Sequence, residues 1–321
     1  LNTPSDGQSG ALIVNLDDIK PGSPAAWLLA IRPKTFGVAV SPVIAALAVT
    51  LSDTGKINVL VAVLTALLAI LMQAITNMEN DAGYSKRKAE RGNRKGLPRA
   101  TSLGLLSVPE VELAIKLTGL IALAITGYFI YITHWVFLLI TVASIAAAYL
   151  YMGGPKPIAY SPYGEIVVFI FFGLTAVCGT YYLQLSDISM TVTIVGCALG
   201  LMAAAVLCVN NYRDRKHDES IERYTMAVVL GKELSILAYK MMLYVPYGLM
   251  LCIVALDSSR YPYLLSWVTL PIALKLPKDL ANKDGLELNG TLFATVNLEV
   301  LFALTLTLGA IIHAYLRWFS L

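Results

Sequence analysis

The chain has 321 residues, of which 57% are hydrophobic and only 14% are charged, and its formal net charge is +3. Soluble domains usually carry roughly 25% charged residues, so this composition excludes an ordinary soluble domain and favours an integral membrane protein. The sequence contains no Walker loop, no dinucleotide-binding fingerprint and no nucleic-acid-binding signature, so we expect no nucleic-acid partner.

The first 25 residues differ in composition from the rest of the chain. They are polar and contain Gly, Ser and Pro, and we expect 1–25 to be a mobile tail ahead of a transmembrane domain over 26–321. Apolar stretches of roughly 18 residues or more then recur, which is the length of a bilayer-spanning helix. They predict an all-α, polytopic membrane protein with nine spans, at about 34–52, 57–80, 108–131, 135–153, 163–184, 190–211, 234–256, 261–277 and 294–317.

The basic residues are distributed unevenly between the two ends of these spans. If the N-terminus is cytoplasmic, only Lys56, Arg260 and Arg317 fall outside, while Lys116 and Lys240 lie within spans. Because Lys and Arg favour the cytoplasmic side of a membrane protein, we expect a multi-pass protein of the inner (plasma) membrane with its N-terminus and its long loops in the cytoplasm.

Two spans end in the same polar pattern. Asn77 and Asp81 lie four residues apart at the end of the second span, and Asn210, Asp214 and Asp218 repeat that spacing at the end of the sixth. Residues four apart share one face of a helix. Since both spans end on the same side of the membrane, the two faces could converge on one site.

The acidic pair in the sixth span has an electrostatic consequence. Asp214 and Asp218 repel each other on a helix, and the repulsion grows near a low-dielectric boundary unless a cation lies between them. Lys or Arg could be that cation, but so could Mg²⁺, which prefers carboxylates together with phosphate oxygens. Neighbouring basic residues could hold the remaining phosphate oxygens. The alternative for each cluster alone is a charged cytoplasmic loop; two clusters with the same spacing favour a site.

Tyr151 precedes a Gly- and Pro-rich exit from the fourth span, 153–157. It could therefore face a cavity, where its ring could stabilise an allylic carbocation by cation–π attraction. The alternative is an aromatic anchor at the membrane interface.

Together these segments resemble the UbiA superfamily of intramembrane prenyltransferases. Within it the chain is most similar to the 1,4-dihydroxy-2-naphthoate polyprenyltransferases of menaquinone synthesis. The resemblance covers the chain from residue 26 onward and is carried by IRPKT at 31–35 and by the stretches 77–85, 94–100, 151–157 and 210–231.

The resemblance implies nine helices around a central cavity, with Mg²⁺ bridging the carboxylates and a prenyl diphosphate. It also implies electrophilic prenylation of an aromatic acid, with loss of the ring carboxylate. The protein would be in contact with membrane lipid. The catalytic residues would be Asp81, Asp214, Asp218 and Tyr151. The metal ligands would be Asn77, Asp81, Glu90, Asp214 and Asp218. The substrate-binding residues would be Asn77, Lys86, Arg94, Arg99, Lys156, Asn210, Arg213 and Arg223.

The sequence departs from the family pattern in its first motif. Tyr84 stands where the family usually has another aspartate, and Glu90 stands at a later acidic position that is more commonly aspartate. Glu90 could supply the missing negative charge as a metal ligand. The alternative is that Glu90 balances the neighbouring basic residues as a solvated surface pair.

The alternative acceptors are other aromatic acids, such as 4-hydroxybenzoate or homogentisate, and an alternative of another class is an ion-coupled transporter. The acidic groups lie at span ends rather than at the midplane, which disfavours the transporter.

Overall fold

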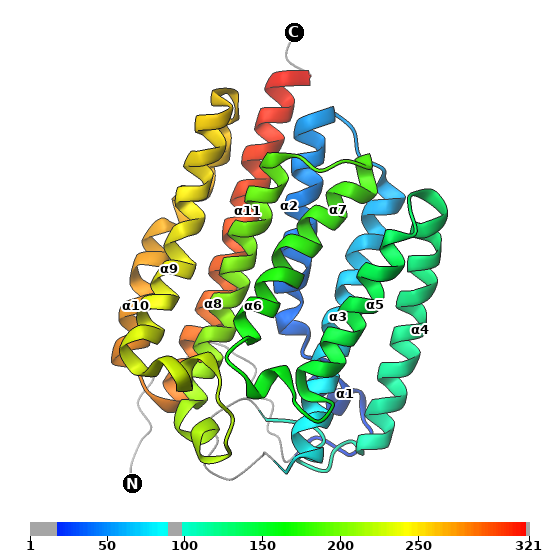
Figure 1. Cartoon of the computed structure of the whole chain (residues 1–321), viewed down its shortest axis with the longest axis vertical. Coiled ribbons are helices and arrows are strands. Elements are labelled where there is room, and N and C mark those ends of the chain that lie inside the picture. Colours follow the sequence, from blue (N-terminus) through cyan, green and yellow to red (C-terminus); the bar gives the residue numbers. More distant parts are fainter. Residues whose placement is uncertain (1–17, 89–97, 319–321) are drawn as a thin grey trace.

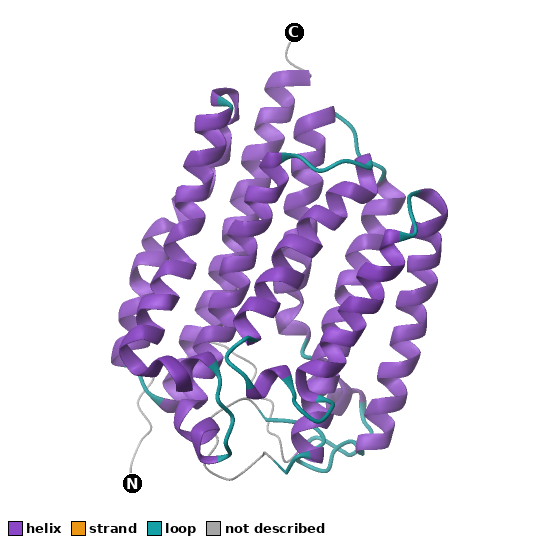
Figure 2. Cartoon of the chain, in the orientation of Figure 1, coloured by secondary structure: helices purple, strands orange, loops and turns teal. Residues whose placement is uncertain are grey.

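The computed structural model describes residues 18–88 and 98–318, and Figure 1 shows their helices running side by side. The described part of the chain consists of helices and loops, without a strand (Figure 2), which confirms the all-α prediction. Its α-helices are α1 Pro24–Ile31, α2 Phe36–Thr54, α3 Val59–Lys86, α4 Val108–Ile132, α5 Val136–Met152, α6 Gly164–Val168, α7 Ala176–Leu185, α8 Met190–Ser220, α9 Met226–Leu256, α10 Leu270–Asn282 and α11 Leu288–Trp318.

Short irregular helices connect some of these elements. A π-helical segment, η4 Phe169–Thr175, joins α6 to α7 without a break, and a 3-10 segment, η5 Ser258–Thr269, leads into α10. Single 3-10 turns precede α2, α6 and α11, at η2 Pro33–Thr35, η3 Ile158–Tyr160 and η6 Gly285–Glu287.

Seven helical segments of the described residues are long and apolar enough to cross a membrane, and α5 is a shorter apolar helix. The predicted span at about 261–277 falls on η5 and α10 rather than on one helix. Pro262 lies within η5, and Pro271 lies in the first turn of α10, where proline is tolerated. The count of nine spans therefore stays a prediction.

Two helices extend further than the apolar pattern indicates. α3 continues to Lys86 rather than ending at about residue 80, and α8 continues to Ser220 rather than ending at about residue 211. Hydropathy indicates where the side chains along a helix become polar. The helix itself ends where its backbone hydrogen bonding ends, which can be several residues later. Both polar motifs consequently lie on the last turns of helices, with fixed directions for their side chains.

Side chains fix where several of these helices begin. Asn58 accepts a hydrogen bond from the Val61 amide (3.2 Å) at the start of α3. Ser107 and Glu110 form a capping box at the start of α4. Such caps satisfy backbone amides that have no partner within the helix.

Small residues let the central helix α8 approach its neighbours closely. A Cβ atom added at Gly173 of η4 would clash with the backbone of Gly200 in α8. Close approach through small residues is typical of helix pairs in membranes. The largest buried cluster lies among α2, α8, α9 and α11 and includes Tyr239, Leu243 and Phe302.

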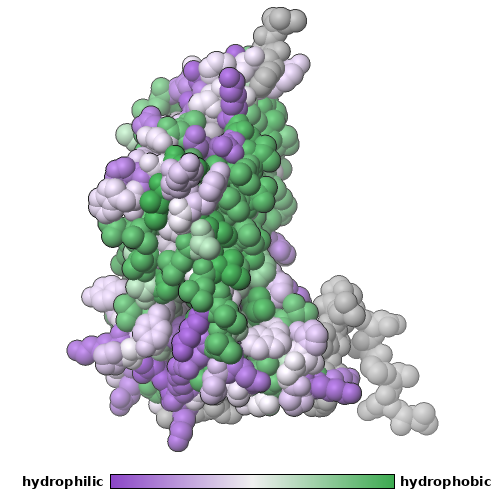
Figure 3. All heavy atoms as spheres, turned by 90° about the vertical axis from the view of Figure 1, so that its right-hand side faces the viewer, coloured by the Kyte–Doolittle hydropathy of each residue, from purple (hydrophilic) through white to green (hydrophobic). Residues whose placement is uncertain are grey.

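On the face of the molecule that Figure 3 shows, an apolar band lies between two polar ends. On α4, for example, Leu117, Leu120 and Ile121 are exposed. An exposed apolar surface of this extent suits lipid rather than water. In Figure 1, α1 lies at the lower end, together with the ends of α3, α5 and α8 that carry the polar motifs, while α11 ends at the opposite end.

Candidate active site

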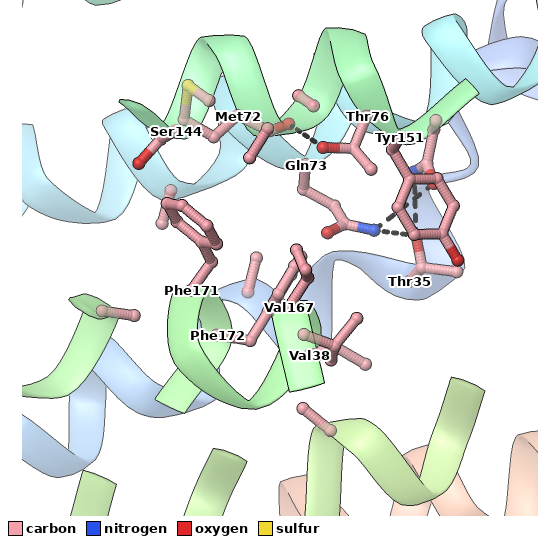
Figure 4. A pocket seen from close by; sticks show the side chains of 18 of the residues that line it. Thr35, Val38, Met72, Gln73, Thr76, Ser144, Tyr151, Val167, Phe171 and Phe172 are labelled. Carbon is pink, nitrogen blue, oxygen red and sulfur yellow. Dashed lines mark hydrogen bonds between the residues drawn. The ribbon is translucent and has the colours of Figure 1, made fainter. Parts of the chain in front are cut away.

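A cavity of about 340 Å³ lies among α2, α3, α5, α7 and α8. Residues of α3 line it from Thr65 to Tyr84, a distance of about 28 Å at the α-helical rise per residue. Figure 4 shows Phe171 and Phe172 pointing into this space from η4. The cavity is therefore a long slot parallel to the helices.

The two ends of the slot differ in chemistry. Its far part is mainly apolar and is lined by Leu68, Phe137, Ile140 and Leu183, among others. The hydroxyls of Thr65, Thr141 and Thr180, which also line it, are hydrogen-bonded within the protein. Its near end, beside the polar motifs, is lined by three guanidinium groups and by neutral hydrogen-bonding side chains: Arg32, Arg99, Arg223, Thr35, Gln73, Asn77, Asn80, Tyr84, Tyr151 and Asn210. Among the described residues that line the slot, none is acidic. The near end is suited to an anion and the far part to a hydrocarbon.

Asn77 ties α3 to the junction between α1 and α2. Its amide nitrogen donates to the Ile31 carbonyl (2.7 Å) and to the Thr35 hydroxyl (3.0 Å), and Gln73 also donates to Thr35 (3.1 Å). The carbonyl at the end of a helix has no partner within that helix, and Asn77 supplies one here. This contact holds Arg32, which adopts a left-handed backbone conformation (φ 55°), at the near end of the slot.

Asp81 is fully buried and is bonded to the loop that precedes α4. Its carboxylate accepts hydrogen bonds from the backbone amides of Ala100 (2.9 Å) and Thr101 (2.8 Å) and from the Thr101 hydroxyl (2.5 Å). Asp81 is not among the residues that line the slot. These bonds give it a positioning role, because they fix the turn that carries Arg99 into the slot. Its assignment as a metal ligand stays a prediction.

Tyr84 lies between two arginines. The guanidinium carbon of Arg99 is 3.6 Å from the centre of the Tyr84 ring, and Arg223 donates a hydrogen bond to the Tyr84 hydroxyl. Arg223 also donates to Asp218 (3.1 Å) and to the Ala159 carbonyl (2.6 Å). The two polar motifs are therefore joined through Arg223, which connects Tyr84 on α3 with Asp218 on α8.

Arg223 is buried and remains charged. Burial acts to lower its pKa, but the neighbouring Tyr84, Asp218 and Tyr151 outweigh this effect, and the pKa is raised from its ordinary value. A buried charge is stable only when it is paired and hydrogen-bonded, and the ion pair with Asp218 meets that requirement.

Asp214, the first acid of the second motif, belongs to a separate hydrogen-bond network. Arg213 donates to both oxygens of Asp214 (2.9 and 2.8 Å), to Asn210 (2.7 Å) and to Asn289 (2.7 Å). Two parallel bonds between an arginine and a carboxylate are among the strong hydrogen bonds of proteins. In this structure Arg213 is therefore directed at protein groups.

The remaining predicted site residues are placed as follows. Tyr151 forms part of the slot wall near its polar end (Figure 4). Lys86 forms an ion pair with Glu112 on the partly exposed surface, and Lys156 is exposed in the loop after α5; neither is among the residues that line the slot. Glu90 and Arg94 lie outside the described residues.

Sequence reasoning overlooked several residues at the near end. Asn80 lies three residues after Asn77 and four before Tyr84, so the three share a helix face. That spacing is the sequence signal from which Asn80 could have been predicted to lie at the site. Glu165 was also overlooked, although it is not among the residues that line the slot. It is buried and accepts a hydrogen bond from Asn211 (2.9 Å), while its other carboxylate oxygen has no partner among the described residues.

The donor groups on α8 fit a divalent cation better than those on α3. No group of three or more His, Cys, Asp and Glu side chains within residues 18–88 and 98–318 is arranged to hold a metal ion. Asp214 and Asp218 are buried and, like Asp81, are not among the residues that line the slot. They nevertheless lie one turn apart at the end of α8, and a carboxylate oxygen that accepts one hydrogen bond from arginine keeps a second lone pair. Two such carboxylates and the oxygens of a phosphate are the ligand set that Mg²⁺ prefers.

Comparison with known proteins adds independent evidence. The model of the UbiA prenyltransferase family matches residues 39–285. The 1,4-dihydroxy-2-naphthoate octaprenyltransferase of Haemophilus influenzae is 31% identical over 260 residues, which cover 78% of this chain and 82% of that protein. The Escherichia coli protein of the same name is 30% identical over 296 residues, covering 88% and 94%, respectively.

Solved structures share the same arrangement of helices. A UbiA homolog from Archaeoglobus fulgidus, bound to GPP and Mg²⁺, has a TM-score of 0.64 at 15% identity, with 88% of this chain and 99% of that chain covered. The apo structure of a UbiA homolog from Aeropyrum pernix has a TM-score of 0.66 at 16% identity, with 88% and 98% covered. At these identities the likeness shows the fold.

Proposed function

The chain belongs to the UbiA prenyltransferase family, and on that premise we propose that it transfers a polyprenyl group to 1,4-dihydroxy-2-naphthoate. The donor is a prenyl diphosphate, and the acceptor loses its ring carboxylate. The relatives that carry the name of this activity match most of the chain at about 30% identity.

The observation that carries the proposal is the division of the slot into a cationic end and an apolar part. A prenyl diphosphate has the same division, with an anionic head and a hydrocarbon tail. Arg32, Arg99 and Arg223 lie where the head would bind, and the slot continues along α3 as far as Thr65. Guanidinium groups match phosphate oxygens in both charge and geometry.

The chemistry begins with cleavage of the bond between the first prenyl carbon and the diphosphate oxygen, whose electron pair leaves with the diphosphate. Asp214 and Asp218 would hold Mg²⁺, which when bound neutralises the charge that develops on the leaving group. Arg99 and Arg223 bind and orient the same group.

Tyr151 faces the slot next to this end, where its ring stabilises the allylic cation electrostatically. The ring carbon that bears the carboxylate attacks the cation, and the electron pair of its bond to the carboxylate returns to the ring as carbon dioxide leaves, which restores aromaticity. The apolar walls, including Phe171 and Phe172, exclude water that would otherwise capture the cation.

The distribution of basic residues supports an inner-membrane location with the site facing the cytoplasm. Lys86 and Arg87 lie at the end of α3 and Lys156 follows α5, at the lower end of Figure 1. Arg317 lies at the end of α11, at the opposite end, and Arg260 lies in η5, which follows α9. The prenyl donor would reach the slot from the lipid phase and the soluble acceptor from the cytoplasm.

The experiment is a transfer assay with purified protein in detergent or lipid. The protein is incubated with Mg²⁺, a long prenyl diphosphate and, separately, 1,4-dihydroxy-2-naphthoate, 4-hydroxybenzoate or homogentisate, and the products are identified by mass. We expect a prenylated, decarboxylated naphthoquinol. If product formed only from 4-hydroxybenzoate or only from homogentisate, prenyl transfer would stand but 1,4-dihydroxy-2-naphthoate would be excluded as the acceptor.

A further inference from the structure

We propose that Gln73 binds the aromatic acceptor, a role that rests on the proposed function above. The oxygen of its side-chain amide accepts a hydrogen bond from the 4-hydroxyl of 1,4-dihydroxy-2-naphthoate. The arginines and Tyr151 at the polar end are assigned to the diphosphate and to the allylic cation, which leaves the ring of the acceptor without a residue that holds it.

Gln73 lies on α3, one turn further into the slot than Asn77. Four residues advance an α-helix by about 6 Å, which places Gln73 where the polar end gives way to the apolar part. The first prenyl carbon follows the diphosphate directly, so a ring that attacks this carbon must lie at the same boundary. Figure 4 shows Gln73 pointing from α3 into the space that Phe171 and Phe172 face from η4.

The neighbours of Gln73 fix the direction of its amide. The Thr35 hydroxyl gives its single proton to the Arg32 carbonyl (2.9 Å), so its oxygen can only accept from Gln73 (3.1 Å). The Asn77 nitrogen donates to the Ile31 carbonyl (2.7 Å), so the Asn77 oxygen also accepts from Gln73 (3.4 Å). Both contacts require the nitrogen of Gln73. Its amide oxygen is therefore turned away from Thr35 and Asn77.

The Gln73 oxygen is buried and has no hydrogen-bond partner among the described residues. Gln73 as a whole is only 7% exposed. A buried carbonyl oxygen without a donor is unfavourable and uncommon in proteins. A ligand that brings a donor to this oxygen would therefore gain binding free energy that a purely apolar ligand would not.

Only one of the ligands expected in the slot supplies such a donor. The ionised diphosphate and the prenyl chain contain no N–H or O–H group, and the ionised carboxylate of the acceptor only accepts hydrogen bonds. Mg²⁺ is held through carboxylates, and none of the described residues that line the slot is acidic. The hydroxyl groups of the acceptor remain.

The 4-hydroxyl is the hydroxyl that is free to donate to the protein. The 1-hydroxyl is adjacent to the carboxylate and donates to it within the same molecule, whereas the 4-hydroxyl has no such neighbour. With the 4-hydroxyl at Gln73, the carbon that bears the carboxylate would lie nearer to the polar end and to the first prenyl carbon. Phe171 and Phe172 provide apolar surface for the second ring. The contact with Gln73 positions the ring and takes no part in bond making.

The test measures binding of two naphthoates to the purified protein by calorimetry, with Mg²⁺ and unreactive geranyl thiodiphosphate present and oxygen excluded. One ligand is 1,4-dihydroxy-2-naphthoate, and the other is 1-hydroxy-2-naphthoate, which lacks the 4-hydroxyl. We expect the unmodified protein to bind the dihydroxy compound about 10-fold more tightly, because the other compound leaves the Gln73 oxygen buried without a donor. Gln73→Leu, which has no acceptor oxygen, should bind the two compounds about equally.

Two controls separate this contact from a structural role of Gln73, whose nitrogen also bonds to Thr35 and Asn77. The affinity of Gln73→Leu for geranyl thiodiphosphate, measured without a naphthoate, should be unchanged. Thr76→Val is the matched variant, because Thr76 lines the slot from the same helix but its hydroxyl donates to the Met72 carbonyl of that helix (2.9 Å). This variant should retain the difference between the two naphthoates.

Equal binding of the two naphthoates to the unmodified protein would overturn this role of Gln73 without recourse to any variant. A difference that persists in Gln73→Leu, or an equal loss of affinity for all three ligands in that variant, would overturn it by giving Gln73 a structural role alone. The proposed function is tested separately: it fails if no aromatic acid is prenylated, whereas the role of Gln73 fails on the hydroxyl preference of a protein that transfers the prenyl group.

Discussion

Asp81 and Thr101 are joined by three hydrogen bonds across a gap of 20 residues. The Thr101 amide and hydroxyl both donate to one carboxylate oxygen (2.8 and 2.5 Å), and the hydroxyl also contacts the Asp81 backbone carbonyl (2.9 Å). The end of α3 is thereby fastened to the loop that carries Arg99. The spacing pattern predicts that Asp81 is a metal ligand, but in the structure its carboxylate holds this loop in place.

Replacing Asp81 should therefore reduce stability as well as activity. Asp81→Ala leaves two buried backbone amides without their acceptor, while the Thr101 hydroxyl keeps the backbone carbonyl of residue 81. We expect a loss of about 1–3 kcal/mol in the free energy of unfolding. The measurement is reversible unfolding in mixed micelles. Thr101→Val is the matched control, because it removes the hydroxyl alone and should cost less. An Asp81→Ala variant that is inactive yet as stable as the unmodified protein would favour the metal-ligand role.

Replacing Asp214 should act on chemistry more than on donor binding. We expect Asp214→Asn to lower kcat by about 100-fold or more, the scale seen when one charge-stabilising group is removed, and to raise the Mg²⁺ concentration needed for half-maximal rate. Kinetics over a Mg²⁺ titration measure both effects. Asp279→Asn is the control, because Asp279 on α10 pairs with Lys283, the residue after that helix, and neither lines the slot. An unchanged Mg²⁺ titration in Asp214→Asn would remove that residue from the metal site.

The apolar part of the slot should set the preference for donor length. Gly179 lies on α7 in the slot wall, and a Cβ added there meets open space. Gly179→Leu should therefore fold normally and occupy volume that a long chain needs. We expect kcat/KM for a long donor to fall by about 10-fold or more relative to geranyl diphosphate. Gly127→Leu, exposed on α4 and equally free of clashes, should leave that ratio unchanged. A parallel fall for both donors would place the prenyl chain elsewhere.

Orientation is tested by labelling intact cells with a membrane-impermeant thiol reagent. The four native cysteines are free, and Cys252 is exposed, so all are first replaced. With a cytoplasmic site, Glu219→Cys at the end of α8 should be protected and Ser258→Cys after α9 should react. Both positions are exposed at the surface. The reverse labelling pattern would invert the proposed topology.

The sequence was sufficient for the membrane class, the helical fold and the convergence of the two motifs. Long apolar runs define helices because the bilayer leaves the backbone few other choices. Equal spacing at the ends of α3 and α8 indicated a common site, and the structure joins those ends through Tyr84, Arg223 and Asp218.

The direction of individual side chains was beyond the sequence. Four residues advance a helix by about 40° beyond a full turn, so Asp81 points to one side of Asn77 while Asn80 and Tyr84 point to the other. Spacing alone does not reveal that the backbone of Thr101 meets that carboxylate, nor that Arg213 is engaged by Asp214, Asn210 and Asn289. Such contacts depend on loops whose paths follow from tertiary packing.

Prenyl transfer coupled to decarboxylation can be followed with 1,4-dihydroxy-2-naphthoate labelled with ¹³C in its carboxylate. With a long prenyl diphosphate and Mg²⁺, we expect an unlabelled prenylated naphthoquinol and one ¹³CO₂ released per product molecule, both detected by mass spectrometry. No product from this acceptor, or a prenylated product that keeps the label, would contradict it.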